Sequence, residues 1–335
     1  MKMFLIKLIK FLLIGLFPFV LLLIGYIIND PYKVIYRYDN FSNSKVTLNK
    51  DYISTETLFR NRGRYESFIF GSSRTMAFKP KVWQKYIGSK SKILVFDSSC
   101  ESIYGIYKKI HLLDSLNINI NNVLIILCRD YSFNGEGDSD GHLFMKHYYL
   151  SHKSYLDFQF CFYKAYLSPK FLFSYYGYLI FGKTYGWMDR YIESENIDFD
   201  PLTNEMRRIE LEKEIYFNSK KFYRRSFKDG SFFKRPVPVL DSISRISFLQ
   251  KEMIIKIHNI LLKHKTKYKI ILSPLYIQIG FNQKDVDFLQ SVFNRNLYNF
   301  SGVNKYTNSY LNYYENSHYT VKVGGDILKT IYYKL

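Results

Sequence analysis

Five short apolar runs, separated by segments with helical spacing, constrain the fold of this chain more than any other feature. The runs are 68–70, 92–97, 122–128, 268–274 and 297–300. The segments expected to be helical are 74–86, 103–116, 243–265, 286–294 and 323–333. Apolar runs without polar alternation are typical of parallel strands covered on both faces. The pattern therefore predicts an α/β fold, a three-layer sandwich with a doubly wound parallel sheet of about five strands.

The amino-terminal segment has the composition of a membrane anchor. Residues 11–28 carry no charge, and with the apolar residues before them they reach the length of about 20 residues that a bilayer requires. Three lysines precede this segment: Lys2, Lys7 and Lys10. By the positive-inside rule they keep the amino end in the cytoplasm, which Lys33 and Arg37 oppose weakly. A cleaved signal peptide is the alternative, but no small-x-small cleavage site follows. We expect a tail and single transmembrane helix over 1–30.

Composition narrows the class of protein further. The chain has 335 residues, of which 47% are hydrophobic, and a net charge of +19, so it is globular and suited to an anionic partner. The anionic partner could be nucleic acid, lipid headgroups or a charged wall polymer, and a simple bias of composition would explain the charge without any partner. The expected anchor argues against nucleic acid. The three cysteines, Cys100, Cys128 and Cys161, cannot all pair and lack metal-site spacing. We therefore expect no disulfide framework, no metal and no cofactor.

The chain divides into three regions by composition. After the anchor, residues 31–64 are expected to form a polar approach segment, to which 45–48 could add an edge strand. Residues 65–335 are expected to form the main domain, interrupted by an aromatic-rich insertion at about 131–240. This insertion suits a lid or substrate wall over the sheet edge, or a plain hydrophobic subcore. The charged helix expected at 205–221 suits solvated surface.

The first apolar run ends in a turn that could present a nucleophile. Residues 68–70 are aromatic or β-branched and are followed by Gly71, Ser72 and Ser73. Glycine permits a tight bend that would place Ser73 at the carboxyl edge of the sheet. An ordinary strand-to-loop turn has the same composition.

A second motif near the carboxyl end supplies the partners of a serine nucleophile. A serine hydroxyl needs an imidazole to take its proton, and the imidazole needs a carboxylate to orient it. Glu315 and His318 are three residues apart, so both side chains can lie on one side of a turn. A surface histidine near the terminus is the alternative interpretation of His318 alone.

Together, the two motifs resemble the SGNH (GDSL-like) hydrolase superfamily, whose first block is Gly-Asp-Ser and whose last is Asp-x-x-His. Ser72 replaces the first Asp, as in the membrane-anchored branch that includes the D-alanine transfer protein DltD and cell-surface O-acetylation proteins. Glu315 replaces the second. The resemblance covers the chain from about Phe68 to its end. It implies that Ser73 is the nucleophile, His318 the general base and Glu315 the orienting carboxylate, with Ser72 as the alternative nucleophile.

The family also places oxyanion donors in the loops after the second and third strands, and here the chain departs from the family pattern. The second loop offers the backbone N–H groups around Ser99 and Cys100, where the family has Gly. The third offers Arg129 and Asp130, where the family has Asn. An ionised Asp130 accepts hydrogen bonds and cannot donate one, whereas Arg129 could donate or could pair with Asp130.

The resemblance implies acyl-ester chemistry at the cell envelope. We expect a serine acyltransferase, such as an O-acetyltransferase, or an esterase that acts on a cell-surface glycan or wall polymer. It would be held in the bacterial cytoplasmic membrane by a single pass, with the large domain outside. A multi-pass acyl-exporting membrane protein is the partner that the resemblance suggests. The alternative is a catalytically degenerate subunit that binds or assembles envelope glycans.

The expected orientation can be tested in cells. Protease added to intact spheroplasts should digest residues 65–335, because the anchor would place this domain outside the cytoplasm. A cytoplasmic protein in the same cells is the control for intactness. Protection of the domain until the membrane is permeabilised would contradict the orientation.

Overall fold

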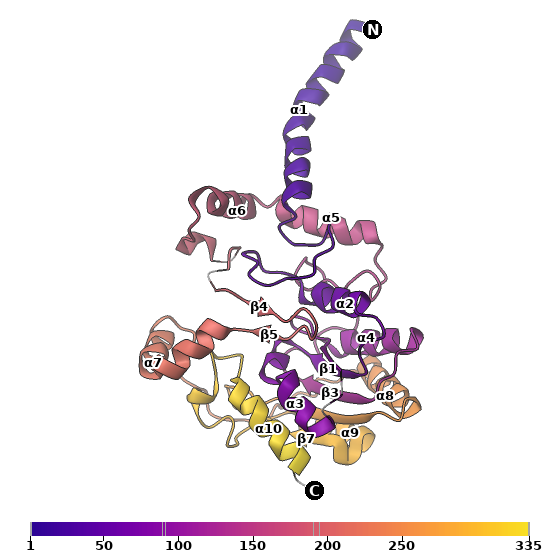
Figure 1. Ribbon diagram of the computed structural model, residues 1–335, viewed down its shortest axis with the longest axis vertical. Helices are drawn as coiled ribbons and strands as arrows, with labels where there is room; N and C mark the ends of the chain where they lie inside the picture. The colour runs from indigo at the N-terminus through magenta and orange to yellow at the C-terminus, as the bar shows by residue number, and fades with distance from the viewer. Residues whose placement is uncertain (1, 89, 91, 190, 194, 334–335) are drawn as a thin grey trace.

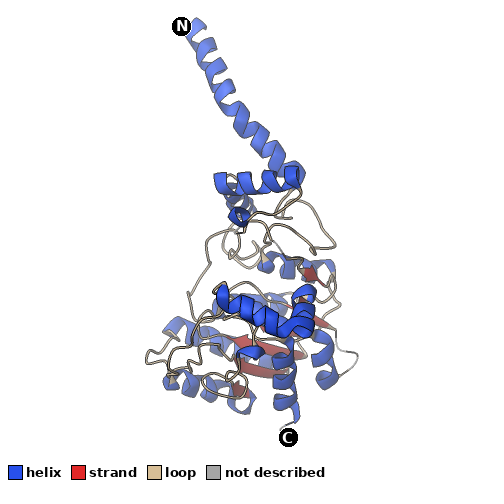
Figure 2. Ribbon diagram, turned by 90° about the vertical axis from the view of Figure 1, so that its left-hand side faces the viewer, coloured by secondary structure: helices blue, strands red, loops and turns tan. Residues whose placement is uncertain are grey.

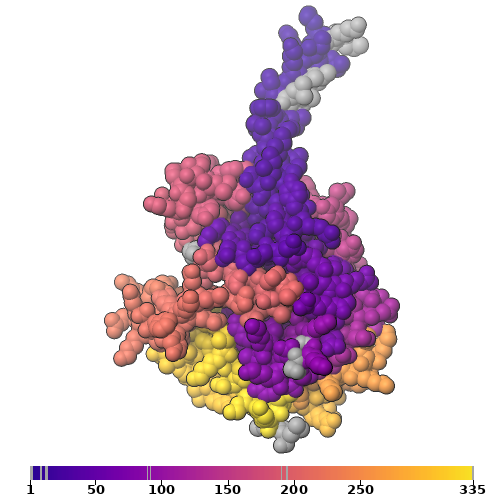
Figure 3. Space-filling model, in the orientation of Figure 1, coloured from indigo at the N-terminus to yellow at the C-terminus, as the bar shows by residue number. Residues whose placement is uncertain are grey.

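The structure is a computed structural model that describes residues 2–88, 90, 92–189, 191–193 and 195–333, of which residues 2, 8, 9, 12 and 13 are described by their backbone alone. The predicted tail and domain each extend past this range, at residue 1 and at residues 334–335. Helix α1 (Lys2–Asn29) projects from a rounded body, and the carboxyl end lies at the opposite end of that body (Figure 1; Figure 3).

A five-stranded sheet with the strand order β2-β1-β3-β6-β7 forms the centre of the body. The strands are β1 (Ser67–Gly71), β2 (Ile93–Val95), β3 (Asn122–Leu127), β6 (Lys267–Leu272) and β7 (Leu297–Asn299). Every neighbouring pair is parallel. Each strand coincides with one of the five apolar runs, so the prediction of an α/β fold with a parallel sheet is confirmed.

Helices cover both faces of this sheet, as Figure 2 shows. Phe68 and Phe70 of β1 point into one core, together with α4 (Ile103–Ser115), α8 (Phe248–Lys263) and α9 (Gln283–Phe293). Ile69 points into the other, with α3 (Pro80–Ile87) and α10 (Val321–Tyr333). Successive residues of a strand face opposite sides, so strands that are apolar throughout serve both cores.

A third cluster of buried aromatic side chains joins the base of α1 to the insertion. It contains Tyr26 of α1, Tyr32 shortly after this helix, and Phe158 and Phe162 of α5 (Tyr155–Tyr166). The insertion continues as α6 (Pro169–Phe181), η2 (Gly186–Met188), β4 (Asp198–Phe199) and β5 (Met206–Arg207). Strands β4 and β5 form a separate antiparallel pair. The insertion and the residues that precede the sheet therefore form a third core together, separate from the two cores of the sheet.

The segment before the sheet differs from its prediction. No strand includes residues 45–48 within the described chain, so the expected edge strand is wrong. The backbone there bonds to the insertion instead, since the carbonyl oxygen of Lys45 accepts the N–H of Glu193 at 2.7 Å. Residues 31–64 also contain α2 (Lys50–Arg60), most of whose residues are buried. The polar composition of this segment did not predict a buried helix, because the partners of its buried polar groups lie far along the chain.

Two predicted helices have other bounds. The helix expected at 74–86 is divided into η1 (Ser73–Ala77) and α3, with Pro80 in the first turn of α3. Proline lacks a backbone N–H and cannot continue a helix from the preceding turn. The helix expected at 205–221 is α7 (Ile209–Lys228), since Met206 pairs in β5. Much of α7 is solvated as predicted, but Phe222 and Tyr223 are buried.

Helix α1 follows the predicted anchor closely in its bounds. Most of its exposed large side chains, from Met3 to Ile28, are apolar, and Lys7 and Lys10 are the exposed charged ones among the described side chains. Within the part of the chain that the structure describes, however, no helix qualifies as both long and apolar enough to cross a membrane. The transmembrane anchor therefore stays a prediction.

Two adjacent glycines on α10 test how closely this helix packs on η1, which begins with Ser73. A Cβ atom at Gly324 would lie 2.0 Å from the carbonyl oxygen of Ala77, whereas one at Gly325 would meet no atom within 4 Å. Gly324→Ala should lower the free energy of unfolding by about 1–3 kcal/mol through overpacking. Gly325→Ala should raise it by roughly 0.5–1 kcal/mol through helix propensity. Urea unfolding of both variants in detergent measures this, and equal effects would contradict the close packing.

Candidate active site

The turn after β1 holds Ser73 at the carboxyl edge of the sheet. Gly71 ends β1 with a φ of 148°, and a Cβ atom there would lie 2.7 Å from the carbonyl oxygen of Ile126. Only glycine fits such a close approach in that conformation. Because β1 lies between β2 and β3, the chain reverses its direction of strand addition here. Ligands of doubly wound sheets bind at such a switch point, beyond the carboxyl ends of the strands.

His318 lies on a short loop whose two ends are fixed in the core. Tyr313 and Tyr319 are buried and form an isolated antiparallel bridge. Inside this bridge, the N–H of Tyr314 donates to the carbonyl oxygen of His318 at 2.8 Å. Two buried aromatic side chains and a tight backbone bond therefore determine where the imidazole points.

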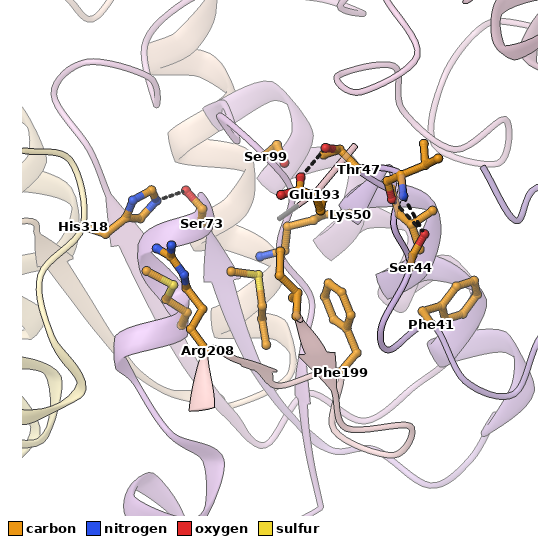
Figure 4. A pocket seen from close by; sticks show the side chains of 15 residues that line it. Phe41, Ser44, Thr47, Lys50, Ser73, Ser99, Glu193, Phe199, Arg208 and His318 are labelled. Carbon is orange, nitrogen blue, oxygen red and sulfur yellow. Dashed lines mark hydrogen bonds between the residues drawn. The ribbon is translucent and has the colours of Figure 1, made fainter. Parts of the chain in front are cut away.

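Ser73, His318 and Glu315 form a hydrogen-bonded chain. Ser73 Oγ lies 2.7 Å from Nε2 of His318, as the dashed line between them marks (Figure 4). Nδ1 of His318 is bonded to Oε1 of Glu315, whose Oε2 accepts the backbone N–H of His318 at 3.2 Å. With its proton on Nδ1, a neutral imidazole donates to the carboxylate and leaves Nε2 to accept the serine proton. The structure thus brings together the three residues that the sequence singled out.

The Glu315 side chain is partly buried, yet its surroundings favour the ionised carboxylate over the neutral acid. Burial raises its pKa, but hydrogen bonds from the His318 ring and backbone lower it, and the net pKa lies below its ordinary value. A depressed pKa means that the stabilisation is complete at neutral pH and is lost as the pH falls through that pKa. Glu315 therefore remains an acceptor for His318 throughout the neutral range.

Arg74 joins the serine turn to the histidine loop. Its Nε donates to the carbonyl oxygen of Ser317 at 2.8 Å, and its side chain is almost fully buried. Ser317 Oγ in turn lies 3.1 Å from Nδ1 of His318. Because Arg74 directly follows Ser73, one side chain couples the position of the nucleophile to that of the base. Sequence reasoning gave Arg74 no role.

The remaining residues predicted in the first two loops are dispersed. Ser72 is buried and its Oγ lies 3.2 Å from Sγ of Cys128, so it points away from His318. Ser99 lines the same cavity as Ser73. Cys100 is exposed and has a φ of 50°, a left-handed conformation unusual for this residue type.

Arg129 and Asp130 pair with each other, the second of the two arrangements considered from the sequence. Arg129 Nη1 donates to Asp130 at 2.7 Å, and its Nε donates to Asp241 at 2.7 Å. Asp130 also lies 3.8 Å from Arg74. Neither residue is part of the lining of the cavity beside Ser73. With two carboxylates on its guanidinium, Arg129 is already engaged.

A cavity of about 170 Å³ opens beside Ser73 and His318 (Figure 4). Its walls come from residues 41–50, before the sheet, and residues 193–208, in the insertion. The lining is mostly apolar: Phe41, Val46, Leu48, Met76, Ile197, Phe199 and Met206. The insertion therefore supplies one wall of the site, and a segment expected to be a linker supplies the other.

The lysine, arginine and glutamate side chains of this lining each have a partner within the protein. The pairs are Lys50 with Asp97, Arg208 with Glu195, and Glu193 with Thr47. Arg208 is held by both oxygens of Glu195, the strongest geometry for such a pair. A group that enters the cavity therefore meets apolar side chains, two cations that are already paired with carboxylates, and a carboxylate that accepts a hydrogen bond from Thr47.

Four buried charged side chains form a cluster that begins at Asp51, directly after the cavity residue Lys50. Asp51 of α2 is 3.0 Å from Lys109 and 3.2 Å from Lys146. Both lysines also pair with Glu101, Lys109 at 2.6 Å. Burial raises the pKa of Asp51, but the two lysines and the N–H of His147 outweigh it and hold the pKa well below its ordinary value. The cluster is neutral as a whole, and each member has more than one partner.

Asp97 connects this cluster to the serine turn. Lys109 Nζ donates to the carbonyl oxygen of Asp97 at 2.8 Å. The Asp97 carboxylate accepts the hydroxyl of Thr75 at 2.6 Å and is paired with Lys50. No local pattern marks these residues as partners, since they are separated by tens of positions along the chain.

Comparisons with known proteins do not identify a family. A scan against protein-family models gives no match, and a search of curated proteins gives none either. Within the described residues, no group of three or more His, Cys, Asp or Glu side chains is arranged to hold a metal ion.

The two adjacent serines can be distinguished with an active-site label. A fluorophosphonate should modify the wild-type protein and Ser72→Ala, because Ser72 points toward Cys128 and away from the imidazole. Ser73→Ala should lose the label, because a serine is reactive only where a base takes its proton. Both variants should unfold at the same urea concentration as the wild type. Loss of the label in Ser72→Ala alone would contradict the assignment.

Proposed function

We propose that this protein is a serine-dependent acyltransferase or esterase, with Ser73 as nucleophile. The observation that carries the proposal is the chain of hydrogen bonds from Ser73 through His318 to Glu315. Nucleophile, base and orienting carboxylate lie in the order that activates a hydroxyl at neutral pH. They also stand beside a cavity, where a substrate could be held against Ser73.

The reaction has two steps that share one proton path. First, Ser73 Oγ bonds to the acyl carbon of an ester, its proton passes to Nε2 of His318, and the alcohol leaves with that proton. Second, a sugar hydroxyl or water attacks the acyl carbon and gives its proton to Nε2, and Ser73 leaves as it regains the proton. The acceptor decides between transferase and esterase.

The backbone N–H of Ser73 is the best placed donor for the oxyanion of each step. Within the described chain, no carbonyl or side chain accepts this N–H. A donor that starts unpaired loses nothing when a developing oxyanion arrives. Ser99, on the same cavity, is the second candidate through its backbone.

The proposed setting is the bacterial cytoplasmic membrane, with α1 in the bilayer and the large domain outside. The exposed apolar side chains of α1 support contact with lipid. A cell-surface glycan or wall polymer is the proposed acceptor, and a multi-pass acyl-exporting membrane protein the proposed source of the acyl group. This part of the proposal depends on the resemblance to membrane-anchored SGNH proteins.

A glycan-binding or assembly subunit without catalysis is the second candidate. Two observations favour it: Asp130 stands where a donor is expected, and Arg129 is held by two carboxylates. The first candidate is preferred because the hydrogen bonds of Ser73, His318 and Glu315 would have no use in a subunit that only binds.

Turnover of an activated ester separates the two candidates. With p-nitrophenyl acetate, Ser73→Ala and His318→Ala should each lower turnover by about 10³-fold or more, because the triad acts as a unit. Glu315→Gln should leave a measurable remnant, since it keeps the shape of the side chain but loses its charge. His111→Ala, an exposed histidine on α4, is the matched control and should match the wild type. Wild-type turnover equal to that of Ser73→Ala would favour the binding subunit.

A further inference from the structure

The helices at the base of α1 expose large apolar side chains. Leu156 and Phe160 of α5 are 76% and 66% exposed, and Phe173 and Ile180 of α6 are 74% and 75% exposed. Trp187 follows in η2 and is 59% exposed. Both helices lie beside the base of α1, as two views and the surface show (Figure 1; Figure 2; Figure 3). Side chains of this size at neighbouring positions form a continuous apolar surface rather than isolated exceptions.

The direction of this surface follows from the helical periodicity. On α5, Phe158 and Phe162 are fully buried in the aromatic cluster, and Phe160 lies on the opposite side of the helix. On α6, Phe171 is buried in the same cluster, and Phe173 lies on the opposite side. Because the buried faces rest on the body, the apolar faces point away from it, at the end from which α1 projects.

Helix α1 is fixed tightly to these two helices. A Cβ atom at Gly25 would lie 2.7 Å from the hydroxyl of Tyr176 and 3.0 Å from that of Tyr166. The ring of Tyr26 lies 5.3 Å and 5.2 Å from the rings of Tyr163 and Tyr166. Aromatic contacts of this kind add to the stability of the area they bury. The apolar surfaces of α1, α5 and α6 therefore belong to helices that pack directly on one another.

The residues around this surface suit the boundary between lipid and water. Among the exposed charged residues on or next to these helices, the lysines Lys164, Lys170 and Lys183 outnumber the aspartates Asp157 and Asp189. Lysine can bury its aliphatic stem and keep its ammonium group among headgroups, and tryptophan is enriched at this depth. The net charge of +19 favours a surface of anionic lipid.

We infer that α5, α6 and η2 form a second membrane contact, which lies in the headgroup layer of an anionic bilayer beside α1. The inference rests on the proposed insertion of α1. Two observations favour lipid over a second protein. The apolar surface adjoins α1, and lysines lie beside its apolar residues. A bilayer surface needs both kinds of side chain next to each other, whereas a protein partner does not. The contact would hold the catalytic cavity at a fixed height, because Phe41 and Phe199 belong both to the aromatic cluster and to the cavity wall.

The two tryptophans of the chain allow a direct test. The full chain would be reconstituted in vesicles of phosphatidylcholine and phosphatidylglycerol, with and without bromine on the acyl chains. Trp187 should lose most of its emission to the brominated lipid. Trp83 is fully buried in the sheet core and should keep its emission, so Trp187→Phe should abolish the quenching.

Matched variants extend the test to other positions. In the Trp187→Phe background, Phe173→Trp should restore quenching. Phe248→Trp should not, because Phe248 is equally exposed but lies on α8, away from the base of α1 (Figure 1). Quenching at both positions, or at neither, would overturn the inference.

Extraction of the same vesicles distinguishes the two proposals. If alkaline carbonate leaves the protein in the vesicles while Trp187 and Phe173→Trp are not quenched, the anchor stands and the second contact is wrong. If Trp187 is shielded only at high protein concentration and without bromine quenching, the surface binds a second copy and the inference is equally wrong. If carbonate removes the protein, the proposed insertion of α1 is wrong, and the second contact, which rests on it, is wrong as well.

Discussion

The buried ion cluster of Asp51, Glu101, Lys109 and Lys146 is the constraint on which the site depends. Four charges inside a protein are costly to desolvate, and removing one partner of a buried pair typically costs about 3–5 kcal/mol. The cluster therefore fixes the segments that meet in it: α2, the loop before α4, α4 itself and the start of the insertion. Through the Asp97 carbonyl and carboxylate, it also holds the turn that carries Ser73 in place.

The site is thus built from two rigid halves. The parallel sheet supplies Ser73 at its switch point and the loop with His318, and Arg74 joins them. The aromatic cluster supplies the opposite wall of the cavity and continues to the base of α1. A nucleophile on the sheet and a wall on the aromatic cluster place the proposed chemistry next to the proposed membrane surface.

The sequence predicted the sheet and the proximity of Ser73, His318 and Glu315, for physical reasons. Continuous apolar runs have few alternatives to buried parallel strands, and the spacing of Glu315 and His318 is a local property. It failed where partners are distant: Asp51 on α2 appeared as part of a polar linker, because Lys109 and Lys146 that neutralise it come much later. The walls of the cavity and the clamp by Arg74 are also long-range, so no local pattern could indicate them.

The proposed function requires that His318 activates Ser73 at the cavity beside them. A crystal structure of the protein after reaction with a fluorophosphonate tests this most directly. We expect phosphorus bonded to Ser73 Oγ, His318 Nε2 within hydrogen-bonding distance of the adduct, and an adduct oxygen that accepts the N–H of Ser73. An adduct on another residue, or His318 turned away from a modified Ser73, would contradict it.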